Sequence, residues 1–156
     1  MGETIDHSGV PVHPPLFFAS ALLLGALIDD RLWRLVILSN HDWRWLGMIP
    51  LLLGLTLAAT GRKAMVQRGT NVNPTLPTTA IVENGPFRFT RNPLYLGLTL
   101  IYVGLSFFLN TWWSLFLLIP VWLVMHFLIV RREEAYLERK FGQPYLAYCQ
   151  RVRRYL

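Results

Sequence analysis

The sequence predicts an all-α membrane protein, a polytopic bundle of about four transmembrane helices that ends in a helical segment on the cytoplasmic side. Hydrophobic residues make up 53% of the 156 residues, and the mean hydropathy is +0.37. Charged residues make up only 15%, whereas soluble domains contain roughly 25%. The apolar residues are concentrated in four runs, which is typical of membrane-spanning helices. We therefore interpret residues 1–156 as a single membrane domain.

The first two runs are Leu16–Ile28 and Trp43–Gly61. The first is short, because a span needs about 20 residues. The segment that follows it, residues 29–38, is predicted to be an amphipathic piece at the membrane interface, with Trp33 among the headgroups. The second run opens with two tryptophans, which also suit the interface, and Pro50 predicts a kink.

The last two runs, Leu94–Leu109 and Trp112–Val130, are separated only by Asn110 and Thr111. So short a connection predicts a tight antiparallel hairpin of two helices.

Lysine and arginine gather on one side of the predicted bundle. Of the 15 Lys and Arg residues, only Arg31, Arg34 and Arg44 lie on the other side. The positive-inside bias then places the N-terminus, the middle loop and the C-terminal tail in the cytoplasm. We expect an integral protein of a bacterial inner membrane. The net charge of +6 fits anionic headgroups, so membrane lipids and not nucleic acid are the expected partners.

Two cytoplasmic segments, residues 62–93 and 131–156, carry the polar features that point to function. The first is a long loop whose prolines and glycines prevent a continuous helix, and long loops in compact bundles tend to be functional. The second is predicted to continue the fourth run as a helix, to end that helix at Gly142 and to open a short helix at Pro144. The single cysteine, Cys149, excludes an internal disulfide, and no metal site is expected.

The end of the loop, "GPFRFTRNPLY", has the chemistry of an anion site. Arg88 and Arg91 are three residues apart, and Pro93 disfavours a helical conformation at Asn92, so a helix should begin here. A helix N-terminus beside two guanidiniums binds anions well. The alternative is that both arginines only anchor the helix at the membrane interface.

The fourth run and the tail that follows it contribute a histidine and acidic groups. Glu133 and Glu134 lie one turn beyond the fourth run, and His126 lies inside it. With α-helical periodicity, His126 and Glu133 share one face, and an ionisable residue within a span is functional by default. The alternatives are carboxylates that are solvated or paired with arginines, and a neutral histidine bonded to a neighbouring helix.

Aromatic residues also lie near the cytoplasmic end of the predicted bundle. Aromatic rings can bind a sulfonium by cation–π attraction or stack on a purine. These residues are Tyr95, Tyr136, Phe141, Tyr145 and Tyr148. Cations, carboxylates and aromatics together suit a ligand with an anionic end, a cationic end and a nucleoside. S-adenosylmethionine has all of these groups.

These motifs resemble a known family. "GTNVNPTLPTTAIVENGPFRFTRNPLYLG" followed by "EEAYLERKFGQPYLAYCQRVRRYL" is similar to the integral-membrane methyltransferases related to isoprenylcysteine carboxyl methyltransferase and phospholipid N-methyltransferase. The resemblance covers Gly69 to Tyr155. It implies that S-adenosylmethionine binds between the last membrane helices and the cytoplasmic C-terminal segment, and that a lipophilic methyl acceptor enters from the bilayer.

The resemblance assigns roles to individual residues. The expected cofactor-binding residues are Arg88, Arg91, Asn92, Pro93, Tyr95, His126, Glu133, Glu134 and Tyr145, and the expected catalytic residues are His126, Asn92 and Arg91. Two positions depart from the family pattern. Eukaryotic members usually have His where this chain has Asn92, and the phospholipid enzymes carry a Gly-x-Gly where this chain has Gly97-Leu98-Thr99.

The acceptor is expected to be small or lipid-like and apolar, with a reacting carboxylate, thiol or amine. Two other classes compete with a methyltransferase. One is an NADPH-dependent membrane reductase of the sterol-reductase type, whose additional phosphate would need more arginines than the loop offers. The other is a non-catalytic membrane subunit whose charges serve only topology, although that class leaves the ordered motifs without an explanation.

Overall fold

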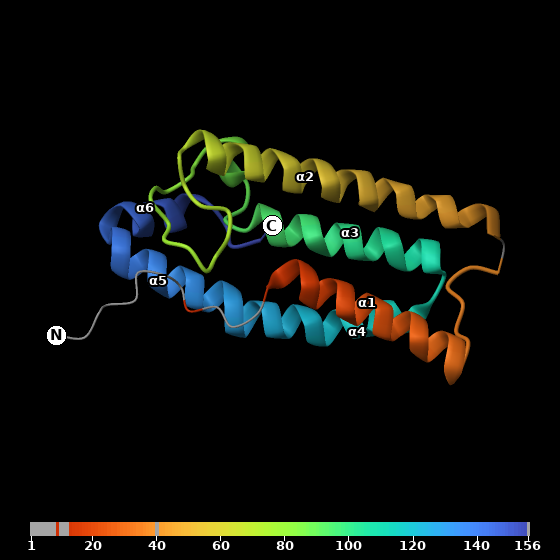
Figure 1. The fold of residues 1–156 in the computed structure, drawn as a ribbon. Coiled ribbons are helices and arrows are strands. Elements are labelled where there is room, and N and C mark those ends of the chain that lie inside the picture. Colours follow the sequence, from red (N-terminus) through yellow and green to blue (C-terminus); the bar gives the residue numbers. More distant parts are fainter. Residues whose placement is uncertain (1–8, 10–12, 40, 156) are drawn as a thin grey trace.

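The protein is a bundle of long helices that lie roughly side by side (Figure 1). The computed structural model describes residues 9, 13–39 and 41–155, and the regular structure within them is entirely helical. The predicted cytoplasmic N-terminus, residues 1–8, lies outside these described residues, and so does the Trp43 side chain. The all-α class predicted from the sequence is confirmed.

The helices follow the predicted apolar runs closely. The helical elements are α1 (Pro14–Arg31), a 3-10 segment η1 (His41–Gly47), α2 (Met48–Gln67), a 3-10 turn η2 (Gly85–Arg88), α3 (Pro93–Leu109), α4 (Trp112–Val124), a π-helical segment η3 (Met125–Val130), α5 (Arg131–Phe141) and α6 (Gln143–Arg151). The elements α4, η3 and α5 form one helix of 30 residues, Trp112–Phe141.

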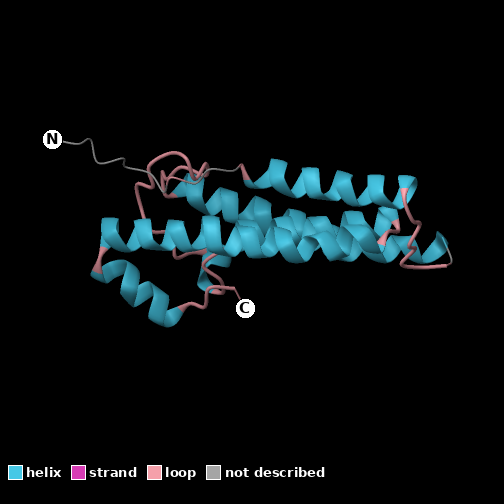
Figure 2. Cartoon of the chain, turned by 90° about the horizontal axis from the view of Figure 1, so that it is seen from below, coloured by secondary structure: helices cyan, strands magenta, loops and turns pink. Residues whose placement is uncertain are grey.

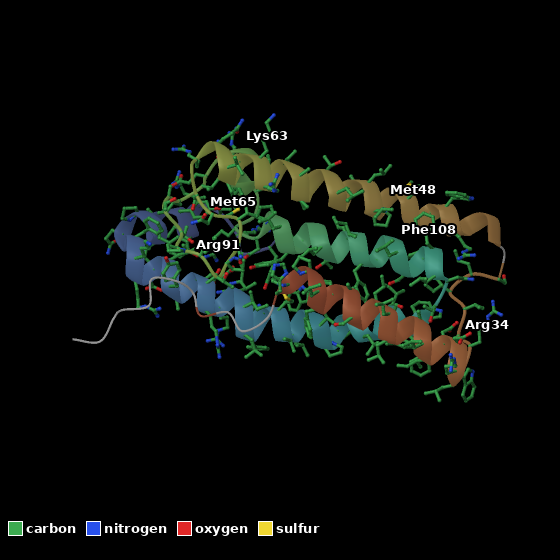
Figure 3. All side chains as sticks on the ribbon, viewed as in Figure 1. Arg34, Met48, Lys63, Met65, Arg91 and Phe108 are labelled. Atoms are coloured by element: carbon green, nitrogen blue, oxygen red, sulfur yellow. The ribbon has the colours of Figure 1, made fainter. Side chains whose placement is uncertain are left out.

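The chain crosses the bundle four times, so that its connections collect at two ends. The loop 68–92 and the helices α5 and α6 lie at one end, and the connecting residues 32–39, 41–47 and 110–111 lie at the other (Figure 1). Helix α2 packs along α3, and α1 packs along α4. Helix α6 turns away from the bundle axis after α5 (Figure 2). Lys63 lies at the first end and Arg34 at the second, which agrees with the predicted division of charge (Figure 3).

Glycines bring η1 and α2 into backbone contact with α3. A Cβ atom added to Gly54 would lie 2.6 Å from the carbonyl oxygen of Gly97, and one added to Gly47 would lie 2.6 Å from the carbonyl oxygen of Gly104. Both pairs repeat after seven residues, so the same face of each helix is used twice. Small residues at helix crossings are typical of membrane bundles, where close packing replaces the hydrophobic effect.

Two helices among the described residues are long and apolar enough to cross a membrane. They are Arg44–Gln67 and Trp112–Phe141, and α3 is a shorter apolar helix of 17 residues. Large apolar side chains point outward, including Leu23, Ile49 and Ile119, which are 64%, 61% and 63% exposed. An apolar exterior of this kind suits lipid better than water.

The predicted interfacial segment, residues 29–38, begins within α1 and continues as a loop. Residues 32–39 are not helical, and the backbone N–H of Leu35 donates to Asp29 Oδ1 at 2.8 Å. The middle loop begins at Arg68 and not at residue 62, because α2 continues to Gln67. Pro50 lies in the first turn of α2, where its missing N–H interrupts no helical hydrogen bond.

The predicted hairpin between α3 and α4 is confirmed. Asn110 adopts a left-handed conformation with φ of 54°. Apart from glycine, asparagine and other residues with short polar side chains tolerate this conformation best. Thr111 caps α4, because its hydroxyl accepts a hydrogen bond from the backbone N–H of Trp113. The Asn110 amide also bonds to both backbone groups of Leu38 at 2.9 Å, which ties the hairpin to the connection after α1.

Candidate cofactor and active site

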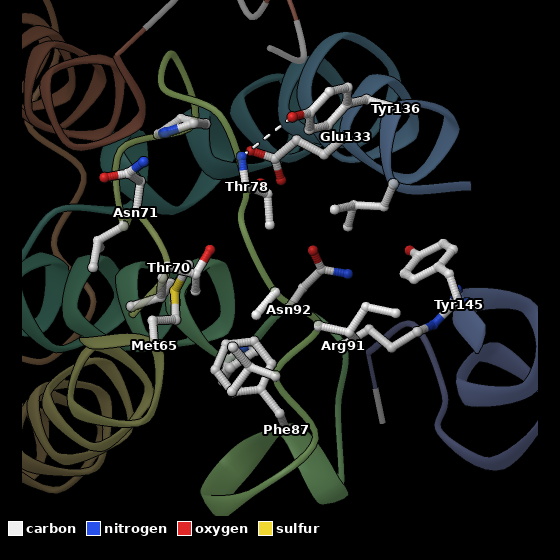
Figure 4. Close-up of a pocket in the computed structure, with 18 of the residues that line it drawn as sticks. Met65, Thr70, Asn71, Thr78, Phe87, Arg91, Asn92, Glu133, Tyr136 and Tyr145 are labelled. Carbon is white, nitrogen blue, oxygen red and sulfur yellow. Dashed lines mark hydrogen bonds between the residues drawn. The ribbon is translucent and has the colours of Figure 1, made fainter. Parts of the chain in front are cut away.

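A cavity opens at the loop end of the bundle (Figure 4). Pro93 sets the start of α3, because its ring fixes φ and keeps Asn92 outside the helix. Gly142, with φ of 59°, lets the chain reverse between α5 and α6. The cavity is lined by residues of α2, the loop, α3, α5 and α6 that include Met65, Thr70, Asn71, Thr78, Val82, Phe87, Arg91, Asn92, Pro93, Tyr95, Glu133, Tyr136, Leu137, Tyr145 and Tyr148.

The loop 68–92 is held as a wall of this cavity by its own threonines. The Thr70 hydroxyl accepts a hydrogen bond from the backbone N–H of Thr79 at 3.0 Å, and the Thr79 hydroxyl donates to the Gly69 carbonyl at 2.8 Å. The backbone N–H of Thr78 donates to the Tyr136 hydroxyl at 3.2 Å, which links the loop to α5 (Figure 4). The loop is therefore fixed at both its start and its middle.

Arg91 is the cation of the cavity. Its backbone N–H donates to the carbonyl of Arg153 at 3.0 Å, and its Nη1 lies 3.1 Å from Glu134 Oε1 and contacts the Cys149 thiol. Only 14% of its side chain is exposed, and its Nε is buried without a hydrogen-bond partner among the described residues. A buried guanidinium N–H without a partner is costly, so an anionic ligand here would be stabilised.

The two adjacent glutamates point in different directions. Glu133 lines the cavity and accepts a hydrogen bond of 2.6 Å from the Tyr95 hydroxyl. Glu134 turns away to an ion cluster, where it lies 3.1 Å from Arg91 Nη1 and 2.7 Å from Arg154 Nη2. Pairing with arginines, which the sequence left open for both residues, therefore describes Glu134 and not Glu133.

His126 lies on η3 and does not line the cavity. Its Nδ1 is 2.8 Å from the Tyr155 hydroxyl, and its ring stacks on Trp122 with 5.4 Å between the centroids. The expectation that His126 shares a face with Glu133 assumed α-helical periodicity. The π-helical segment Met125–Val130 has more residues per turn, so it changes the direction of the side chains that follow.

Tyrosines and the side-chain amide of Asn92 form another part of the cavity wall. The Tyr148 hydroxyl donates to the Phe87 carbonyl at 2.8 Å, and burial raises the pKa of the Tyr145 and Tyr148 phenols well above the ordinary value. Both phenols therefore stay protonated at neutral pH. The Asn92 amide lies near the centre of the cavity and donates to the Arg154 carbonyl at 3.0 Å (Figure 4).

Most of the residues predicted from the sequence meet in this cavity. Its lining includes Arg91, Asn92, Pro93, Tyr95, Glu133 and Tyr145, whereas Arg88, His126 and Glu134 lie outside the lining. Arg88 is exposed on η2, which favours the anchoring interpretation for this one residue.

Sequence reasoning missed the C-terminal arginine and tyrosine. Arg154 bonds to Glu134 and Tyr155 bonds to His126, although in the sequence analysis Arg154 counted only for topology and Tyr155 had no role. No spacing rule connects position 154 to position 134, because the link depends on the turn at Gly142 and on the length of α6. The only available signal was that Arg154 and Tyr155 end the family-like segment.

One protein family matches the chain. Residues 43–144 match the model of the phospholipid methyltransferase family. A search of curated proteins gives no significant match, and neither does a search of solved structures. The matched segment contains α2, the loop, α3, α4 and α5, and therefore most of the cavity wall. Because it covers about two thirds of the residues, this chain belongs to the phospholipid methyltransferase family, a family of membrane methyltransferases.

Proposed function

We propose that this protein transfers a methyl group from S-adenosylmethionine to a small or lipid-like apolar acceptor, in the manner of isoprenylcysteine carboxyl methyltransferase. The observation that carries the proposal is that Arg91 and Glu133, a cation and a carboxylate, both line one cavity with aromatic walls in a chain of this family. The same observation disfavours an NADPH-dependent reductase, because Arg91 is the only arginine among the described residues that line the cavity.

The residues of the cavity fit the methyl donor. Arg91, with its unpartnered Nε, suits the carboxylate of the donor, and Glu133 suits the ammonium group. Tyr136 and Tyr145 provide faces for the adenine or the sulfonium, and aromatic faces attract cations. Asn71 offers amide groups to the ribose hydroxyls.

The protein's own contribution to catalysis is mainly positioning. Bound S-adenosylmethionine supplies a methyl group on a positively charged sulfur. Arg91 and Glu133 hold the two charged ends of the amino-acid portion, which fixes the direction of the methyl group. Val82, Phe87 and Leu137 give the cavity an apolar wall that solvates charge poorly, which favours a reaction in which the positive charge on sulfur is lost.

We propose that the acceptor reaches the methyl group from the bilayer side. A second, smaller cavity lies next to the first and is lined by Phe18, Trp122, Tyr155 and Tyr95 among others, and Tyr95 lines both cavities. An amine or thiol acceptor must lose a proton, and His126 is the candidate base, because its ring is bonded to the hydroxyl of Tyr155, which lines this second cavity. A carboxylate acceptor needs no base.

The cytoplasmic location of the site is part of the proposal. The loop 68–92 and the tail 131–156 would form the site on the cytoplasmic face of a bacterial inner membrane, with both termini on that face. Support comes from Arg62, Lys63 and Arg68, which lie at this end of the bundle.

Ligand binding to the purified protein in detergent tests the function. S-adenosylhomocysteine should raise the melting temperature, and NADPH should not. Glu133→Gln should abolish this shift, whereas Lys63→Gln, an exposed change on α2, should leave it intact. Stabilisation by NADPH alone would move the protein to the reductases. An absence of any shift, with bilayer lipid added, would leave the non-catalytic subunit as the better interpretation.

A further inference from the structure

One stretch of the C-terminal tail, Val152–Tyr155, lies across the start of α3. The Arg154 carbonyl accepts hydrogen bonds from the Asn92 amide at 3.0 Å and from the Thr90 hydroxyl at 3.2 Å. The Arg153 carbonyl accepts from the backbone N–H of Arg91 at 3.0 Å. The tail is therefore bonded to three consecutive residues that lead into the helix, and one of these residues carries the cation of the cavity.

The side chain of Arg154 adds an ionic contact from the same tail. Its Nε lies 3.0 Å and 2.9 Å from the two oxygens of Glu134, and its Nη2 lies 2.7 Å from Oε2. The Glu134 oxygen Oε1 is also 3.1 Å from Arg91 Nη1. The side chains of Glu134 and Arg91 are only 15% and 14% exposed, so water screens this cluster weakly.

The point of interest in this cluster is the balance of charge around Arg91, which depends on how many cations share the Glu134 carboxylate. If Glu134 faced Arg91 alone, the two charges would cancel as a simple ion pair. Because Arg154 also takes both oxygens of Glu134, the pair becomes two cations sharing one anion. The additional positive charge remains near Arg91, while Glu133 stays inside the cavity on the Tyr95 hydroxyl.

We propose that Arg154 is a positioning residue that occupies Glu134 and thereby leaves Arg91 able to bind the carboxylate of the methyl donor. The inference rests on the proposed function, and it adds a residue beyond the segment that matches the family. Arg154 acts through Glu134 and does not line the cavity itself.

Two nucleoside probes separate this role from simple packing. S-adenosylhomocysteine carries the amino-acid end, and 5′-methylthioadenosine is the same thioether nucleoside without it. Arg154→Gln should weaken binding of S-adenosylhomocysteine about tenfold, which is the size expected for one charge-assisted hydrogen bond. Binding of 5′-methylthioadenosine should not change, because that probe has no carboxylate for Arg91.

Three further variants sharpen the test. Arg153→Gln removes the same charge from an exposed neighbour and keeps the backbone carbonyl, so it should affect neither probe. Arg154→Lys keeps the charge and should restore part of the affinity for S-adenosylhomocysteine. In an Arg91→Gln background, Arg154→Gln should add no further loss, because the residue through which it acts is gone.

The outcomes distinguish the inference from the function. Equal weakening of both probes by Arg154→Gln, or no weakening of either, would overturn the role of Arg154 while the wild-type binding still supported a methyltransferase. Failure of the wild-type protein to bind either probe would overturn both proposals. If Arg154→Gln does not fold, Arg154→Lys carries the test. An equal loss of affinity for the two probes in that variant would contradict the inference.

Discussion

Glu133 and Glu134 differ by one position and have different surroundings. Glu133 faces the cavity beside Tyr95, where we propose that it binds the ammonium group of the donor. Glu133→Gln keeps an oxygen for the Tyr95 hydroxyl but removes the charge. We expect it to weaken binding of S-adenosylhomocysteine at least about tenfold with little change in melting temperature, measured by calorimetry and thermal unfolding on the same sample. Full affinity in this variant would remove Glu133 from the site.

Glu134 is expected to matter first for stability. Its replacement by Gln leaves Arg91 and Arg154 close together without their shared anion. The expected loss is about 1–3 kcal/mol of unfolding free energy, which a denaturant titration in detergent measures. A variant as stable as the wild type would show that the ion cluster contributes nothing to folding.

The two loop arginines provide a direct comparison between the sequence and the structure. Both were predicted to bind the cofactor, but Arg91 lines the cavity and Arg88 is exposed. Arg91→Gln should reduce affinity for S-adenosylhomocysteine more than about tenfold, since a charged hydrogen bond is lost. Arg88→Gln should leave the affinity nearly unchanged in the same titration. A large effect of Arg88→Gln would mean that the loop closes further when ligand binds.

At the scale of elements, the contact between α2 and α3 depends on glycine. Gly54→Ala would place a Cβ 2.6 Å from the backbone oxygen of Gly97, and a backbone atom cannot move aside cheaply. We expect a loss of about 1–3 kcal/mol, as for other overpacked sites. Gly61→Ala on the same helix is the matched control, because its nearest atom would lie 3.5 Å away. Equal unfolding midpoints for the two variants would contradict this packing.

The elements also differ in how far the sequence predicts them. The start of α3 at Pro93, the turn at Asn110 and the helix end at Gly142 follow from local rules, because each residue restricts its own backbone. The π-helical segment Met125–Val130 could not be predicted, since its wider turns leave no simple periodic signal. Of the predicted site residues, Arg91, Asn92 and Glu133 line the cavity, whereas Arg88, Glu134 and His126 do not, because the direction of each side chain depends on the packed structure.

At the scale of the whole molecule, the end that holds the cavity also carries most of the lysines and arginines. Lys63 lies at the end that holds the cavity, and Arg34 lies at the opposite end (Figure 3). If the cavity end is cytoplasmic, a membrane-impermeant thiol reagent added to intact cells should label Arg34→Cys in a Cys149→Ser background. In the same background it should label Lys63→Cys only after permeabilisation. The reverse pattern would place the cavity outside the cytoplasm, away from the cellular supply of the methyl donor.

Transfer of a labelled methyl group is the most direct test of the account. Membranes that contain the protein would be incubated with S-adenosylmethionine labelled in its methyl group, and label in the lipid-soluble fraction would be compared for the wild type, Glu133→Gln and Lys63→Gln. The account predicts label with the wild type and with Lys63→Gln, and only background with Glu133→Gln. Equal incorporation with Glu133→Gln would contradict the claim that this cavity holds the donor.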